Sequence, residues 1–279
     1  MDAHRETSTN ADGYRTLKFS SLFDLAFYVD PDAPRRVGSS SIYNSSEFAG
    51  VSIEKAKACA LAGGYWKKGV ANMQKAVAAL PPAMAKSRAR YKTAYAGNRA
   101  AVRQFIAGSP KSMLKRVNVP SDKKVIRFAV CSVSCRLDQN DIINRGAAIL
   151  SVVKELEAEG HSVELTFLFR GVNEGFKYSV ECLIKPSNAF FSPADFAFPI
   201  CNPAFVRRLM WAAAEQHPQL DKASASGYGN GLANTFPDFD LWAPYAMPHS
   251  HFGYATPTDA RKTIAAFVEE QRQAWQVAA

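Results

Sequence analysis

Two apolar runs separated by a helix-forming stretch decide the fold: VIRFAVC at residues 125–131 and SVELTFLF at residues 162–169. Both runs have the β-branched and aromatic content of buried strands. Between them, residues 140–159 carry apolar side chains at helical spacing, with Asn140 or Asp141 available as a cap and Gly160 as a stop. A strand, a helix and a second strand predict a βαβ unit with parallel strands and a right-handed crossover.

The remainder of the second half extends this unit. Residues 177–184 alternate between apolar and polar, which predicts a strand antiparallel to the second strand, and residues 239–242 predict a short buried strand. Residues 203–217 and 258–276 are typical of helices, each with a proline at or next to its start. We therefore expect residues 121–279 to form an α/β domain with a mainly parallel sheet flanked by helices.

The first half of the chain is expected to be different. Residues 1–18 are polar and predict a flexible tail. Residues 51–62 and 67–80 each have helical spacing and end at glycine or proline, and residues 83–114 contain helix formers throughout. We predict a helical, basic N-terminal region over residues 19–120.

Positive charge is concentrated in one segment. The formal net charge is +9, and residues 86–127 contain twelve Lys or Arg against the single acid Asp122. Such a segment either binds anions such as nucleic acid or is a solvated basic helix. On a helix, Tyr91 and Tyr95 would share a face that stacks on bases or packs on a core. The candidate nucleic-acid contacts are Lys86, Arg88, Arg90, Lys92, Arg99 and Arg103 for phosphates, and Tyr91 and Tyr95 for bases.

Several classes of protein are disfavoured by the sequence. No stretch has the ~18 consecutive apolar residues of a membrane span, and the polar start lacks the apolar centre of a signal peptide. The five cysteines are an odd number without paired CxxC spacing, which favours reduced, buried thiols over zinc or disulfides. We expect a cytoplasmic protein.

The loop after the first strand carries a resemblance to a known family. It reads Cys131-Ser132-Val133-Ser134, and here the chain resembles a von Willebrand factor A-type domain, whose first strand ends in Asp-x-Ser-x-Ser and binds a divalent metal. Ser132 and Ser134 match the two serines, but Val130 stands at the aspartate position. Because hard cations need charged oxygen ligands, we expect no bound cofactor. A divalent metal is the alternative, with its carboxylate supplied by Asp138, Asp141 or Asp240.

A second resemblance spans most of the chain from about Phe48. The sequences RGAA at residues 145–148, LEAEGHSVEL at residues 156–165 and GGYW at residues 63–66 are similar to an uncharacterised family of tailed-bacteriophage proteins. This resemblance implies a phage or prophage origin, and hence the host cytoplasm, but no activity.

Three functional hypotheses follow. The first is a non-enzymatic phage protein whose α/β domain binds another protein and whose basic half steers it to an acidic partner. The second is a nucleic-acid-binding protein of phage DNA metabolism that uses the basic segment. The third, an enzyme with its site in the loop over residues 132–141, has no catalytic signature to support it.

Overall fold

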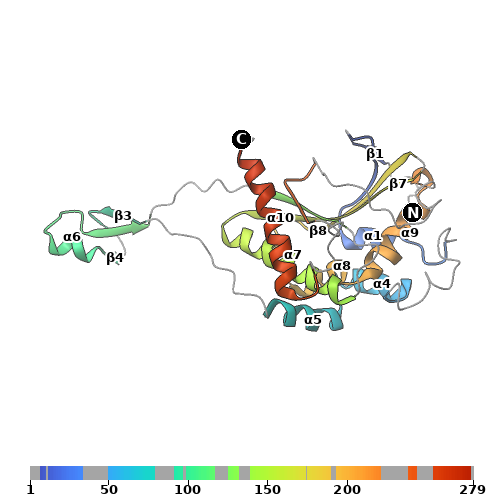
Figure 1. Ribbon diagram of the computed structural model, residues 1–279, viewed down its shortest axis with the longest axis horizontal. Helices are drawn as coiled ribbons and strands as arrows, with labels where there is room; N and C mark the ends of the chain where they lie inside the picture. The colour runs from blue at the N-terminus through green and yellow to red at the C-terminus, as the bar shows by residue number, and fades with distance from the viewer. Residues whose placement is uncertain are drawn as a thin grey trace.

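A six-stranded mixed sheet forms the centre of the main body (Figure 1). Its strand order is β1-β2-β8-β7-β6-β9. The pairs β2–β8, β7–β6 and β6–β9 are parallel, whereas β1–β2 and β8–β7 are antiparallel. The strands are β1 (Ser8–Thr9), β2 (Arg15–Phe19), β6 (Val125–Cys131), β7 (Ser162–Asn173), β8 (Phe176–Lys185) and β9 (Leu241–Ala243). The computed structural model describes residues 7–10, 12–33, 50–78, 91–96, 99–116, 125–131, 139–173, 175–189, 193–220, 238–243 and 254–277.

The predicted βαβ unit is confirmed. Strand β6 leads into α7 (Gln139–Ala158) and then into β7, and Val125 pairs with Ser162 in a parallel register that continues to Cys131 and Leu168. Helix α7 ends at Gly160, whose φ of 99° is accessible to glycine at little cost and whose amide donates to the carbonyl of Glu157. The antiparallel strand β8 and the short strand β9 were also predicted correctly.

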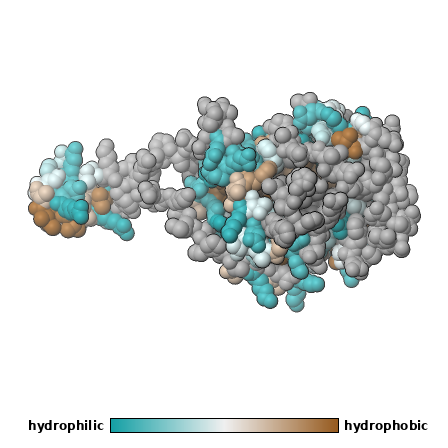
Figure 2. Space-filling model, in the orientation of Figure 1, coloured by the Kyte–Doolittle hydropathy of each residue, from teal (hydrophilic) through white to brown (hydrophobic). Residues whose placement is uncertain are grey.

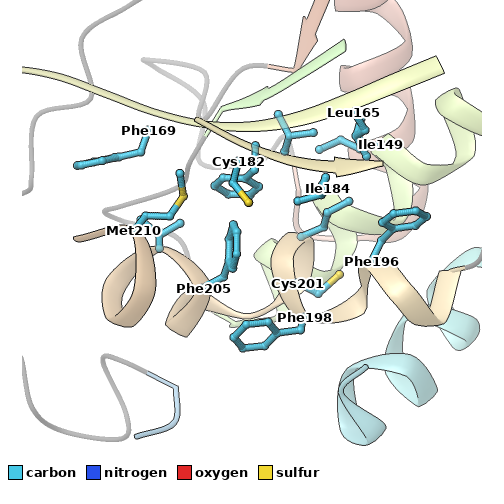
Figure 3. Close-up of a cluster of buried hydrophobic side chains, with 14 of the residues drawn as sticks. Ile149, Leu165, Phe169, Cys182, Ile184, Phe196, Phe198, Cys201, Phe205 and Met210 are labelled. Carbon is cyan, nitrogen blue, oxygen red and sulfur yellow. The ribbon is translucent and has the colours of Figure 1, made fainter. Parts of the chain in front are cut away.

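One face of the sheet is covered by helices and carries the hydrophobic core. Because side chains alternate along a strand, Val163, Leu165, Phe167 and Phe169 of β7 all point to this face and are buried. Figure 3 shows Phe198 and Phe205 from the helices packed beneath the strands that carry Leu165, Cys182 and Ile184. The helices that contribute to this core are α1 (Leu22–Tyr28), α4 (Ile53–Leu61), α5 (Lys67–Ala78), α7, α8 (Pro193–Cys201), η1 (Phe205–Met210), α9 (Trp211–Gln216) and α10 (Pro257–Val277).

The last helix closes one edge of the sheet. Helix α10 (Pro257–Val277) begins after Thr256, whose hydroxyl accepts from the amide of Asp259 at 3.1 Å and so caps the helix. It packs along α7 and against the edge strand β9, where Trp242 meets Phe267 edge to face. No helix in the described part of the chain is both long enough and apolar enough to cross a membrane.

The N-terminal segment differs from the prediction of a flexible tail. Strands β1 and β2 begin within residues 1–18, and β2 adds in parallel to β8 with Leu17 and Phe19 fully buried in the core. The free edge of β8 supplies the backbone partners that the polar composition does not reveal. Helices α4 and α5 form where they were predicted, with Ser52 capping α4, and the core joins residues from both sides of the boundary predicted at residue 120.

Residues 83–114 do not form one long helix where the structure describes them, so the prediction of a helical region was wrong here. They contribute to a small three-stranded antiparallel sheet in the order β3-β5-β4, with the short helix α6 between β4 and β5. The elements are β3 (Tyr91–Ala94), β4 (Arg99–Ala100), α6 (Val102–Ile106) and β5 (Met113–Arg116). Strand pairing between distant residues such as Tyr91 and Arg116 overrides the weak helix propensity. We call residues 91–96 and 99–116 the basic lobe, which stands apart from the main body in Figure 1.

Candidate functional site

The basic lobe presents an apolar face. On α6, Phe105 and Ile106 follow Val102 by one helical turn, so the three side chains share one face. Val102 is 62% exposed, Phe105 70% and Ile106 79%. The brown surface at the end of the lobe in Figure 2 marks the hydrophobic side chains gathered there. We call these three residues the apolar patch. Contiguous exposed apolar side chains of this kind typically mark an interaction site.

The lobe has almost no core of its own. Among its described side chains only Ala101 is buried, while Met113 and Leu114 on β5 are half-buried. Backbone hydrogen bonds hold α6 in place, with the Ala101 amide donating to the Ser112 carbonyl at 2.8 Å. Units below ~40 residues rarely bury enough surface to be stable without further support. The lobe therefore gains stability from any partner that covers the apolar patch.

Positive charge surrounds the patch. Residues 91–116 contain no acidic residue, and the side chains of Arg99, Arg103, Lys111 and Lys115 are exposed. The Lys111 ammonium lies 5.4 Å from the centre of the Tyr95 ring, a cation–π contact that covers one side of that ring. A surface of one sign attracts a partner of the opposite sign and raises the rate of association.

The structure rearranges the predicted nucleic-acid contacts. Arg99 lies on β4 and Arg103 on α6, both exposed, and Tyr95 follows β3 with 72% of its surface exposed. Tyr91 and Lys92 lie on β3, so Tyr91 and Tyr95 do not share a helical face. Lys86, Arg88 and Arg90 lie outside the described residues. The nucleic-acid interface stays a prediction.

A buried guanidinium occupies the carboxyl ends of β6 and β9. Arg145 on α7 is 1% exposed, and its Nη2 donates to the carbonyls of Cys131 at 2.8 Å and Ala243 at 3.3 Å. Ligands of open α/β sheets usually bind at the carboxyl ends of the strands. At the ends of β6 and β9 this position is held by a positive charge of the protein itself.

Asp240 lies beside Arg127 and not at the carboxyl end of β6. Its Oδ2 accepts from the Arg127 amide at 2.8 Å and lies 3.6 Å from the Arg127 Nε. Cys131, the last residue of β6, is four positions further along the strand, or about 13 Å away. Ser132, Ser134 and Asp138 lie outside the described residues. Within the described ranges, no group of three or more His, Cys, Asp or Glu residues is placed to hold a metal ion.

The described thiols are free, and three of the four are buried, with Cys59 partly exposed. Cys59, Cys131, Cys182 and Cys201 form no disulfide with one another. Burial raises the pKa of Cys131 and Cys201 from 9.0 to about 12, so both thiols are protonated and poorly nucleophilic at neutral pH.

Sequence reasoning missed two features of these sites. The i, i+3, i+4 spacing of Val102, Phe105 and Ile106 is visible in the sequence, but their exposure is not. The sequence does not show that Arg145 is buried, because the carbonyls that it binds come from the preceding strand and from a strand 98 positions away in the chain.

The chain matches one family model, described as a domain of unknown function, DUF7192, over residues 8–273. The chain belongs to the DUF7192 family. The match begins at β1 and ends within α10, so the main body and the basic lobe both lie inside the family's domain. No curated protein and no solved structure matches the chain.

Proposed function

We propose that this DUF7192 protein is a non-enzymatic, protein-binding module of phage or prophage origin, which uses its basic lobe to bind an acidic partner protein. The observation that carries the proposal is the apolar patch on α6, exposed on a lobe that has no acidic residue and little core. A partner that offers an apolar groove with acidic residues at its rim would complete both features.

The composition of the patch favours protein over nucleic acid. Val102 and Ile106 are aliphatic, and aliphatic side chains gain from contact with apolar protein side chains, whereas bases stack on aromatic rings. Of the two tyrosines considered for stacking, Tyr95 already has Lys111 over its ring. The positive charges would serve association and orientation on the partner.

The patch alone supports only weak binding. Full burial of a Val, Ile or Phe side chain is worth about 1.5–3 kcal/mol, so three side chains that are roughly two-thirds exposed would contribute about 3–6 kcal/mol together. Loss of translational and rotational freedom costs about 4–15 kcal/mol. Contacts from the surrounding lysines and arginines are therefore part of the proposed interface.

We also propose that the main body is a domain of the von Willebrand factor A type, and the order of its strands supports this. The order β8-β7-β6-β9 places the first strand of the βαβ unit between the second strand and the last, as in doubly wound sheets. We propose that the domain descends from this type and that the charge of Arg145 has replaced the metal.

The test is selection of ligands from a random 12-residue peptide library displayed on yeast. The purified full-length protein and its F105S/I106S variant would be screened in parallel, with F27S as the matched control because Phe27 is 72% exposed on α1 in the main body. We expect wild type and F27S to enrich the same peptides, rich in Asp, Glu and apolar residues, and F105S/I106S to lose them. Enrichment that is unchanged in F105S/I106S, or peptides without acidic residues, would contradict the proposal.

Nucleic acid is the competing outcome. Random single- and double-stranded DNA would be titrated at low and moderate salt with wild type, F105S/I106S and R99E/R103E. Binding that falls steeply with salt, is lost in R99E/R103E and persists in F105S/I106S would replace the protein partner by nucleic acid.

A further inference from the structure

The face of the sheet opposite the core holds a polar cavity of about 390 Å³. Its volume lies within the usual range of small-ligand sites. Strands β2, β6, β7 and β8 form its floor, and Ser8, Asn10, Asp238 and Phe239 also line it. The register of the strands places the residues of the floor next to one another. Across neighbouring strands, the backbone of Arg127 lies beside that of Glu164, Thr166 beside Leu183, and Lys18 beside Glu181.

Two polar side chains on β7 line this cavity and have no hydrogen-bond or ion-pair partner in the part of the chain that the structure describes. Thr166 is 8% exposed and lines the cavity, yet its hydroxyl has no hydrogen-bond partner among the described residues. Glu164, two residues earlier on the same face, is half-buried and likewise has no ion pair or hydrogen bond within the described ranges. The Thr166 hydroxyl is open to solvent in the cavity, so a ligand that forms a hydrogen bond with it takes the place of a water molecule.

The other charged groups of the cavity are paired with one another. Glu181 lies 3.5 Å from Arg170 and 3.6 Å from Lys18. Asp238 lies 3.5 Å from Arg170 and accepts from the Asn10 amide group at 3.4 Å. On β6, Arg127 lies 3.6 Å from Asp240.

Among the described residues, these pairs leave one negative charge uncompensated. The described charged groups that line the cavity, or that pair with its lining, are the cations Lys18, Arg127 and Arg170 and the carboxylates Glu164, Glu181, Asp238 and Asp240. Three cations against four carboxylates give a local charge of −1, and the carboxylate without a partner is that of Glu164. One positive charge on a ligand would balance the cavity.

We infer that this cavity binds a compound with a single protonated amine. The ammonium donates to Glu164 and to the hydroxyl of Thr166, which can accept one hydrogen bond while it donates another. The aromatic ring of Phe239, half-buried beside Ala129 and Leu168, gives the apolar part of the ligand a surface to pack on. Anions are disfavoured, because a second negative charge would lie beside Glu164.

Three compounds of matched size test whether the charge of the ligand or its shape determines binding: benzylamine, benzyl alcohol and benzoate. Each would be titrated into the ¹⁵N-labelled full-length protein, and the shifts of the amide resonances would be measured. We expect benzylamine to shift the amide resonances of residues 164–168, with the alcohol at least about tenfold weaker and benzoate without effect. Binding of benzylamine that is absent, or no tighter than that of the alcohol, would overturn the inference. N-acetyl-lysine methylamide as a fourth probe distinguishes a lysine side chain of a peptide from a free amine as the source of the ammonium.

Variants locate the site. Glu164→Gln keeps the shape of the side chain and removes its charge, and should weaken benzylamine binding by about tenfold. Thr166→Val should weaken it by a smaller factor, since it removes one hydroxyl. Glu270→Gln on the exposed side of α10 is the matched control and should bind as wild type does. Unchanged affinity in Glu164→Gln, with amide spectra that show a folded protein, would also overturn the inference.

Discussion

Replacing Arg145 with methionine should lower the free energy of unfolding by about 3 kcal/mol. The guanidinium donates to the carbonyls of Cys131 and Ala243, and hydrogen bonds to a charged group are worth about 1.5–3 kcal/mol each. Together the two hydrogen bonds are worth about 3–6 kcal/mol. Methionine fills most of the volume of the arginine side chain and needs no desolvation of a charge, so the expected loss of unfolding free energy lies at the lower end of this range. The two carbonyls, however, would stay buried without this donor.

Urea denaturation followed by circular dichroism measures this loss. With a slope of about 3 kcal/mol/M, the midpoint should fall by about 1 M. Lys262→Met, at an exposed position of α10, makes the same change in charge and should leave the midpoint within about 0.2 M of wild type. If Arg145→Met unfolds at the wild-type midpoint, the guanidinium does not hold β6 and β9 together, and its assigned role at the carboxyl ends of the strands is wrong.

Three further predictions concern the core. Gly146→Ala should lower the melting temperature, because the added Cβ would lie 2.5 Å from the Cys201 Sγ. Such overpacking costs about 1–3 kcal/mol and outweighs the ~1 kcal/mol that alanine gains in helix propensity. A higher melting temperature would show that α7 and α8 can separate without cost. Glu157→Gln should lower the free energy of unfolding in urea by about 3–5 kcal/mol. The ammonium of the fully buried Lys185 lies 2.8 Å from the Glu157 carboxylate and would lose its counter-charge. A loss below about 1 kcal/mol would refute this. Because burial raises the pKa of Cys131 and Cys201 from 9.0 to about 12, iodoacetamide at pH 8 should not label them in the folded protein, and stability should fall as the pH rises from 9 towards 12; rapid labelling would contradict their burial.

The sequence predicted those elements whose cause is local. The run at residues 125–131, the helical spacing that follows and the second run at residues 162–169 lie next to one another in the chain, and the right-handed crossover leaves little choice of arrangement. The hairpin to β8 and the capped helices α4 and α10 follow from turn residues and caps within a few positions. The net positive charge of the segment around residues 91–116 is likewise a property of composition.

Helix formers in residues 83–114 were not sufficient to predict structure, because pairing of Tyr91 with Arg116 spans the whole lobe and cannot be read from neighbouring residues. The same holds for β2, whose partner β8 lies more than a hundred residues away. Helix α8 was not predicted, since Pro199 lies inside it and its burial against α5 and α7 outweighs the poor propensity.

The candidate sites depend still more on tertiary structure. The sequence by itself determined that the chain would carry a basic segment, reduced thiols and an α/β core, because charge, cysteine spacing and the βαβ pattern are local properties of the chain. Only the folded chain decided that the apolar patch would be exposed, that Arg145 would bind two strand ends, and that Glu164 and Thr166 would enter one cavity. Exposure and pairing are set by which distant strands become neighbours, and that choice is made by burial summed over the whole core rather than by any local pattern.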